Sequence, residues 1–173
     1  MQPRGFTLLE LLSSLVIISV MLVIAIPSFS SQIQQSNLKT TTLTLLEDIA
    51  TARSKAVFTN KRVVIKNTGS WENGWEIFVD YNNNGIKDGN ETILHSQQKL
   101  KDIRITPNKP LKKYISFIGS GESRFAGVAN GGGLQMGTFT ICAAKSGQGY
   151  SLTLSSNGRI RMNEIEASKC NKP

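Results

Sequence analysis

The sequence predicts an α+β fold in which one long amino-terminal α-helix packs against an antiparallel β-sheet domain. Three observations support this. Residues 6–26 are almost entirely apolar, an amphipathic pattern of helical period follows up to about residue 60, and eight short β-rich runs occupy the remainder. With 173 residues, 39% of them hydrophobic and 18% charged, the chain is neither disordered nor a polytopic membrane protein and has room for one ordinary domain.

The first half of the helix, residues 6–30, is predicted to cross a membrane. Its apolar stretch contains one charged residue, Glu10, and at about 1.5 Å per residue it reaches about 30 Å, the thickness of a bilayer core. Ala25 lies two residues before Pro27, which is a poor cleavage site for a secretory signal, so we expect the segment to remain on the mature protein. Arg4 favours a cytoplasmic amino end, which in a bacterium places the rest of the chain in the periplasm.

The second half of the helix, residues 31–60, is predicted to be amphipathic and to end near Asn60. Its apolar side recurs every three or four residues and consists of Leu38, Thr42, Leu45, Ile49, Ala52 and Ala56. Several threonines in this half are weak helix formers. The helix therefore depends on packing its apolar side against a sheet.

Residues 61–173 are predicted to form the β-rich globular domain, with six to eight antiparallel strands. The candidate strands are 62–66, 74–80, 92–96, 103–106, 114–118, 137–143, 150–155 and 159–162. Between the last two, Asn157 and Gly158 predict a hairpin with a type I′ turn, because both residues tolerate positive φ.

The formal net charge of +8 suggests an anionic partner, and its position in the chain is informative. Residues 1–98 carry equal numbers of cations and acids, so the whole surplus lies in residues 99–173. The only histidine, His95, leaves little material for a histidine-ligated metal site or a catalytic triad. We therefore expect neither an enzyme nor a cofactor.

The amino terminus resembles the type IV prepilin signature. A carboxylate in hydrocarbon costs at least ~2–3 kcal/mol, so Glu10 either stays hydrated at the interface or has a partner. The run from Gly5 through Phe6 to Glu10, after a short basic leader of residues 1–5, resembles the prepilin motif. That resemblance implies cleavage after Gly5 by a prepilin peptidase, N-methylation of Phe6, and pairing of Glu10 with the Phe6 amino group of a neighbouring pilin subunit.

Two cysteines, Cys142 and Cys170, suit a disulfide in the periplasm. Such a bridge would hold the carboxyl-terminal tail, and a loop of about 29 residues gives about 3–4 kcal/mol in the chain-entropy model. The alternative is two unrelated thiols.

One loop matches the calcium-binding pattern of an EF-hand. Its candidate ligands are Asp80, Asn82, Asn84, Asp88 and Glu91. The flanking segments read as strands rather than helices, however, so an Asn/Gly-rich hairpin without an ion is the alternative. A tryptophan, a strand and this turn are also similar to the GspH/FimT group of minor pilins, in which the turn is structural.

The carboxyl-terminal segment carries a candidate DNA-binding motif. Arg159 and Arg161 follow Gly158 and lie on one face of a strand, where they suit successive anionic groups or simply form a solvated basic edge. Gly158, Arg159 and Arg161 followed by a terminal cysteine resemble the tail of FimT-type minor pilins, which implies DNA uptake. Further candidate contacts are Lys112, Lys113, Lys145, Lys169 and Lys172.

These features together predict a minor type IV pilin with a pilin-like fold, anchored in the bacterial inner membrane with a periplasmic domain and assembled into an extracellular pilus. It would bind the phosphate backbone of extracellular DNA without sequence specificity, for uptake in natural transformation. The alternatives are a structural minor pilin or a GspH-like type II secretion pseudopilin without DNA binding, and a calcium-dependent adhesin.

Overall fold

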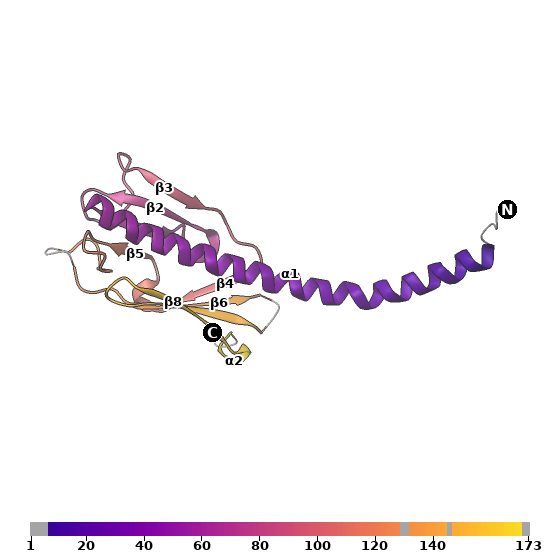
Figure 1. The fold of residues 1–173 in the computed structure, drawn as a ribbon. Helices are drawn as coiled ribbons and strands as arrows, with labels where there is room; N and C mark the ends of the chain where they lie inside the picture. Colours follow the sequence, from indigo (N-terminus) through magenta and orange to yellow (C-terminus); the bar gives the residue numbers. More distant parts are fainter. Residues whose placement is uncertain (1–6, 129–131, 145–146, 171–173) are drawn as a thin grey trace.

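The computed structural model describes residues 7–128, 132–144 and 147–170. A single helix, α1 (Leu8–Thr59), runs through 52 residues. Its first half extends away from the rest of the protein, and its second half lies along a domain of short strands (Figure 1). The predicted α+β fold is confirmed.

Both ends of α1 are defined by their capping residues. At the start, Thr7 accepts a hydrogen bond from the Glu10 backbone N–H through its side chain, while the Glu10 carboxylate accepts one from the Thr7 N–H, which together form a capping box. At the end, Asn60 adopts the left-handed conformation, with φ of 49°, and stops the helix where the sequence predicts.

The first half of α1 exposes apolar side chains to the surroundings. Leu8 and Leu9 are each 77% exposed, and large apolar side chains are also exposed up to Leu22 and at Phe29 and Ile33. Over the part of the chain whose side chains the structure describes, no helix is both long enough and apolar enough to cross a membrane.

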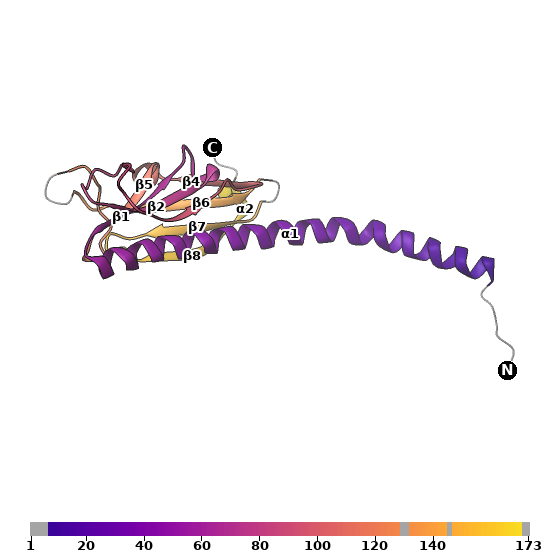
Figure 2. The same cartoon turned by 90° about the horizontal axis from the view of Figure 1, so that it is seen from above.

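The described residues contain eight antiparallel strands in two four-stranded sheets, seen from above beside α1 in Figure 2. The first sheet has the order β3-β2-β1-β5 and consists of β1 (Arg62–Asn67), β2 (Trp75–Asp80), β3 (Ile93–Gln97) and β5 (Tyr114–Phe117). The second sheet has the order β4-β6-β7-β8 and consists of β4 (Ile103–Pro107), β6 (Gly137–Ala143), β7 (Gly149–Leu154) and β8 (Ile160–Ile165). Three single-turn elements complete the chain: the 3₁₀ helices η1 (Trp71–Asn73) and η2 (Lys109–Leu111), and the helix α2 (Ala167–Cys170).

All eight predicted strands are present. The largest difference is at β8, which continues to Ile165 rather than ending at Met162. The division into two sheets was not predicted, because β4 leaves the first sheet and β5 returns to it. The sheet that a strand joins depends on which distant strand it pairs with. The alternation of residues within the strand does not determine that partner.

The core lies between α1 and both sheets. Every residue of the predicted apolar side of α1, from Leu38 to Ala56, is buried, which confirms that face. Trp71 of η1 meets Phe139 of β6 edge-on with ring centroids 4.9 Å apart, and its indole N–H donates to the Leu111 carbonyl at 3.0 Å. Its ring centroid also lies 6.1 Å from that of Trp75 in β2, so Trp71 contacts both sheets.

Candidate nucleic-acid interface

The β7–β8 hairpin presents the predicted Gly-Arg-x-Arg segment, but its turn differs from the prediction. Only Gly158 has positive φ, at 76°, so the turn is not type I′, which requires positive φ at both central residues. The Gly158 N–H donates to the Ser155 carbonyl and the Ser155 N–H to the Arg159 carbonyl, both at 2.9 Å. This longer loop ends in a left-handed glycine, and the Asn157 side chain accepts from the Arg159 N–H at 3.2 Å.

Arg159 and Arg161 are exposed, and β8 is the edge strand of its sheet. Their side chains make no hydrogen bond or ion pair with another described residue. Ile160, between them, packs against the core, so both arginines belong to the opposite face. Two free guanidinium groups on one open edge can each donate to an anionic oxygen.

Arg53 of α1 fixes the position of this hairpin. Its guanidinium donates to the Gly121 carbonyl at 3.0 Å and to the Asn157 carbonyl at 3.2 Å. A Cβ atom at position 158 would lie 2.1 Å from the Gly121 carbonyl oxygen, so the turn packs directly on the loop that contains Gly121. The role of Arg53 was not predicted, because it is 104 residues from Asn157 in the chain.

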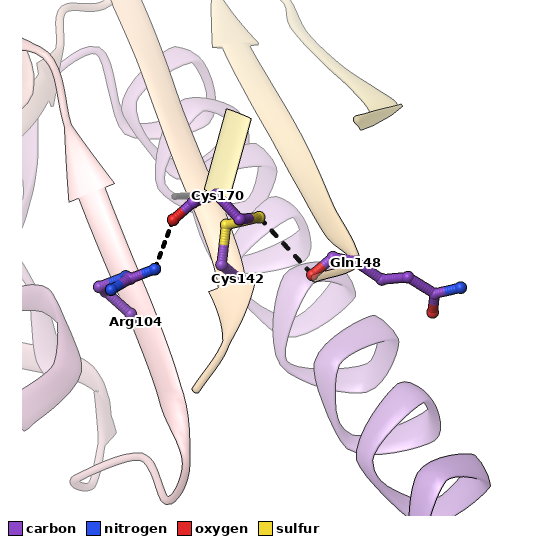
Figure 3. The surroundings of a disulfide bond; sticks show 4 residues. All are labelled: Arg104, Cys142, Gln148 and Cys170. Atoms are coloured by element: carbon purple, nitrogen blue, oxygen red, sulfur yellow. Dashed lines mark hydrogen bonds between the residues drawn. A yellow bond between two sulfur atoms is a disulfide. The ribbon is translucent and has the colours of Figure 1, made fainter. Parts of the chain in front are cut away.

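The predicted disulfide between Cys142 and Cys170 is present (Figure 3). It joins α2 to β6, and the Arg104 guanidinium of β4 donates to the Cys170 carbonyl. The bridge lies at the far end of the sheet from Arg159: Cys142 pairs with Gly149, and Gly149 with Ile165, in strand register. It therefore holds the end of the chain but not the arginine-bearing turn, which Arg53 holds.

The candidate lysines do not form one cluster. Lys169, on α2, is exposed at the disulfide end of the sheet. Lys112 and Lys113 are exposed beside η2, and Lys112 lines a groove with Thr106 at the β4 edge. Lys145 and Lys172 lie outside the described residues. Lys112 and Lys169 thus lie at different parts of the sheet of β8, whereas Lys113 lies beside β1 of the other sheet, where its carbonyl accepts from the Asn67 N–H at 3.2 Å.

Of the amino-terminal candidates, Gly5 and Phe6 lie outside the described residues. Glu10 is exposed, and its carboxylate contacts the Thr7 backbone N–H at 3.5 Å. In this position it satisfies one of the donors at the start of α1, a role that the sequence analysis did not predict.

The candidate calcium loop is closed by its own hydrogen bonds. The buried Asp80 carboxylate accepts from the Asn84 and Gly85 N–H groups at 3.1 and 2.9 Å. The Glu91 carboxylate likewise accepts from the Tyr81 and Asp88 N–H groups at 3.0 and 2.9 Å. The two carboxylates therefore hold the backbone of a β-hairpin connection rather than pointing into an open cage.

The remaining candidate ligands bind one another. The amide groups of Asn82 and Asn84 both donate to Asp88, at 2.6 and 2.9 Å. Arg62 lies opposite Asp80 in the strand register. Burial lowers the pKa of the Arg62 guanidinium, and the negative charge of Asp80 opposes that shift. Among the described residues, no group of three histidine, cysteine, aspartate or glutamate side chains is arranged to hold a metal.

We expect calcium to leave this loop unchanged. The Asp80 and Glu91 carboxylate oxygens, which would have to bind the ion, already accept hydrogen bonds from backbone N–H groups, and Arg62 already supplies positive charge beside Asp80. Titration calorimetry with millimolar calcium should give no heat beyond dilution and no change in melting temperature, with magnesium as the control. A saturable one-site heat would contradict this and revive the adhesin interpretation.

The long helix, the two antiparallel sheets and the disulfide-bonded end define a protein of the type IV pilin class. The crystal structure of the type IV minor pilin FimU from Pseudomonas aeruginosa matches 78% of this chain and 92% of its own, with 20% identity and a TM-score of 0.56. A second crystal form of FimU gives 0.52 at the same identity, with 78% and 94% covered. No curated protein matches the chain.

The family model for type II transport protein GspH matches residues 41–158, more than half of the chain, and the protein belongs to this family. The prokaryotic N-terminal methylation motif matches residues 1–26. Membership implies processing by a prepilin peptidase and assembly with other pilin subunits from the membrane. The predicted GspH-type minor pilin is confirmed at this level.

Proposed function

We propose that this GspH-family protein is a minor pilin that binds extracellular DNA for uptake in natural transformation. The observation that carries the proposal is the pair of exposed guanidinium groups of Arg159, just before the edge strand β8, and Arg161, within it, neither of which bonds to another described residue. No aromatic residue lies in the segment 155–165, so contacts to phosphate rather than stacking on bases are expected. Such binding is weak and independent of sequence.

The amino-terminal residues have proposed roles in assembly. The peptidase cuts after Gly5 and methylates Phe6, and Glu10 pairs with the Phe6 amino group of a neighbouring subunit. The exposed apolar side chains of the first half of α1 support this, because they need lipid or other helices to cover them. Residues 6–30 then anchor the precursor in the inner membrane, with the β-domain in the periplasm, until the subunit enters an extracellular pilus.

The test is a double substitution, Arg159→Gln with Arg161→Gln, in the full chain in detergent. Loss of two phosphate contacts should weaken binding to a duplex and reduce the slope of log affinity against log salt by about 2. Because both side chains are exposed, the melting temperature should not change. Fluorescence anisotropy with a labelled duplex at several salt concentrations measures both effects.

The matched control removes two exposed cations elsewhere, Lys39→Gln with Lys87→Gln, for the same change in net charge. It should retain the affinity of the unmodified protein apart from a small non-specific loss. Equal affinities for the two double variants would show that β8 is not the site.

A structural pseudopilin is the second candidate, and the match to the family model of a type II transport protein favours it. In that case the positive charge of residues 99–173 faces neighbouring subunits. The unmodified protein would then fail to shift DNA even at low salt, which separates the two functions.

A further inference from the structure

The sheet β4-β6-β7-β8 has an outer face that the DNA-binding proposal does not yet use. Strand alternation sends Ile105, Phe139 and Leu152 into the core, so their neighbours in sequence point outward. These neighbours are almost all hydrogen-bonding residues of modest size. We define the hydroxyl face as Thr106, Thr138, Thr140, Ser151, Thr153 and Asn163.

The hydroxyl face is arranged in rows that cross the strands. In register, Thr106, Thr140, Ser151 and Asn163 form one complete row across all four strands. The next row contains Thr138, Thr153 and Arg161, and the hydroxyls of its two threonines lie 3.3 Å apart. The rows are about 6.6 Å apart and about 14 Å wide.

Arg161 belongs to this surface, so the hydroxyl face continues directly from the proposed site. At the opposite edge, Thr106 and Lys112 line one groove. Outward positions in the four strands include no aspartate or glutamate. Glu164 lies on the inner side beside α1. At the β4 edge, the Glu72 carboxylate accepts a hydrogen bond from the Ile105 N–H at 2.9 Å.

Within the described chain, little covers the hydroxyl face. In Figure 1 the sheet is seen nearly edge-on, with α1 on one side and α2 on the other. Helix α2 lies against β6 and β7, near the disulfide. The rows that contain Thr140 and Thr153 are at least partly exposed.

We infer that the hydroxyl face holds the phosphodiester backbone of duplex DNA, with Arg159 and Arg161 as the charged edge of one continuous surface. This inference rests on the proposed function. Threonine, serine and asparagine side chains donate to phosphate oxygens and fix the orientation of a duplex without reading its sequence. A flat polar face with cations at its edges and no aromatic ring suits a paired backbone rather than unstacked bases.

The experiment compares full-length variants in detergent by anisotropy with a labelled duplex. Thr140→Glu with Thr153→Glu places two carboxylates on the hydroxyl face and should lower affinity at least about tenfold. Thr92→Glu with Ser96→Glu introduces the same charge at exposed positions next to and within β3 of the other sheet. It is the matched control, with affinity within about threefold of the unmodified protein.

A second pair guards against misfolding. Thr140→Val with Thr153→Val keeps the shape and strand preference of both residues but removes two donors, and should lower affinity about threefold to tenfold without lowering the melting temperature.

If the Arg159/Arg161 variant loses binding while both threonine variants bind like the control, the hydroxyl face is not part of the site. If the unmodified protein does not bind DNA at all, the proposed function itself fails. An acidic partner protein on this face would likewise leave DNA affinity unchanged in the threonine variants.

Discussion

Replacing Cys142 and Cys170 together by serine is expected to lower the free energy of unfolding by about 3–4 kcal/mol. The bridge joins cysteines that are 28 positions apart and encloses β7, β8 and α2, so its loss lets the carboxyl-terminal end of the unfolded chain separate freely. It also releases contacts in the folded state. The Arg104 guanidinium holds the Cys170 carbonyl, and that contact depends on the position of α2.

The residues around the disulfide leave room for its two sulfur atoms. A Cβ atom at position 149 would lie 2.5 Å from the Cys170 sulfur and 3.0 Å from the Cys142 sulfur. Only glycine at this position therefore allows the disulfide (Figure 3) to lie against β7. The carbonyl oxygen of Gln148 lies 3.6 Å from the Cys170 sulfur.

Urea unfolding of the full chain in detergent measures the effect. A reductant should lower the midpoint of the unmodified protein and leave the double-serine variant unchanged. DNA affinity should survive in the variant, because the bridge lies about 13 Å along the strand from Arg161. Identical midpoints for the two proteins would show that the bridge is energetically silent, and lost DNA binding would show that it positions the arginines after all.

The sequence predicted those parts of the fold that depend on local pattern. The buried side of α1 follows from spacing along one helix, and its burial is complete from Leu38 to Ala56. The eight strands follow from composition and turn residues, and the disulfide from two cysteines in an oxidising compartment.

What the sequence did not predict depends on distant neighbours. Asp48 of α1 accepts from the Trp75 indole N–H at 2.7 Å and lies 3.5 Å from the His95 imidazole, three residues that no motif links. The hydroxyl face is a second case, because alternation within one strand indicates a polar side but not which four strands share it. The role of Arg53 is a third, since its partners come from two separate loops.

The match to the EF-hand pattern is a case in which one local pattern allows two interpretations, a calcium site or an ion-free hairpin. Asp80 and Glu91 occur at the spacing of calcium ligands, yet each accepts two backbone N–H groups in a hairpin connection. An EF-hand loop lies between two helices, whereas here β2 precedes the loop and β3 follows it. These contacts and flanking strands favour the ion-free hairpin, and the calcium titration tests it.

The substitution Gly158→Ala is expected to damage stability and DNA binding together, although it removes no charge. Gly158 has φ of 76°, which is unfavourable for alanine, and the new Cβ would lie 2.1 Å from the Gly121 carbonyl oxygen and 2.7 Å from Arg53 Nε. Backbone strain and overpacking each cost about 1–3 kcal/mol, so the free energy of unfolding should fall by about 2–6 kcal/mol.

The effect on DNA follows from the contacts of Arg53. The turn cannot keep its place on the Gly121 loop once a methyl group is inserted, so the hydrogen bond from Arg53 to the Asn157 carbonyl breaks and Arg159 loses its fixed position. Gly89→Ala is the matched control, because nothing lies within 4 Å of the new Cβ there and φ is not positive. Urea unfolding and duplex anisotropy should separate the two alanine variants in both measurements. If Gly158→Ala keeps both the stability and the DNA affinity of the control, the close packing on the Gly121 loop does not position the turn; if it loses stability but keeps DNA affinity, positioning by Arg53 is unnecessary.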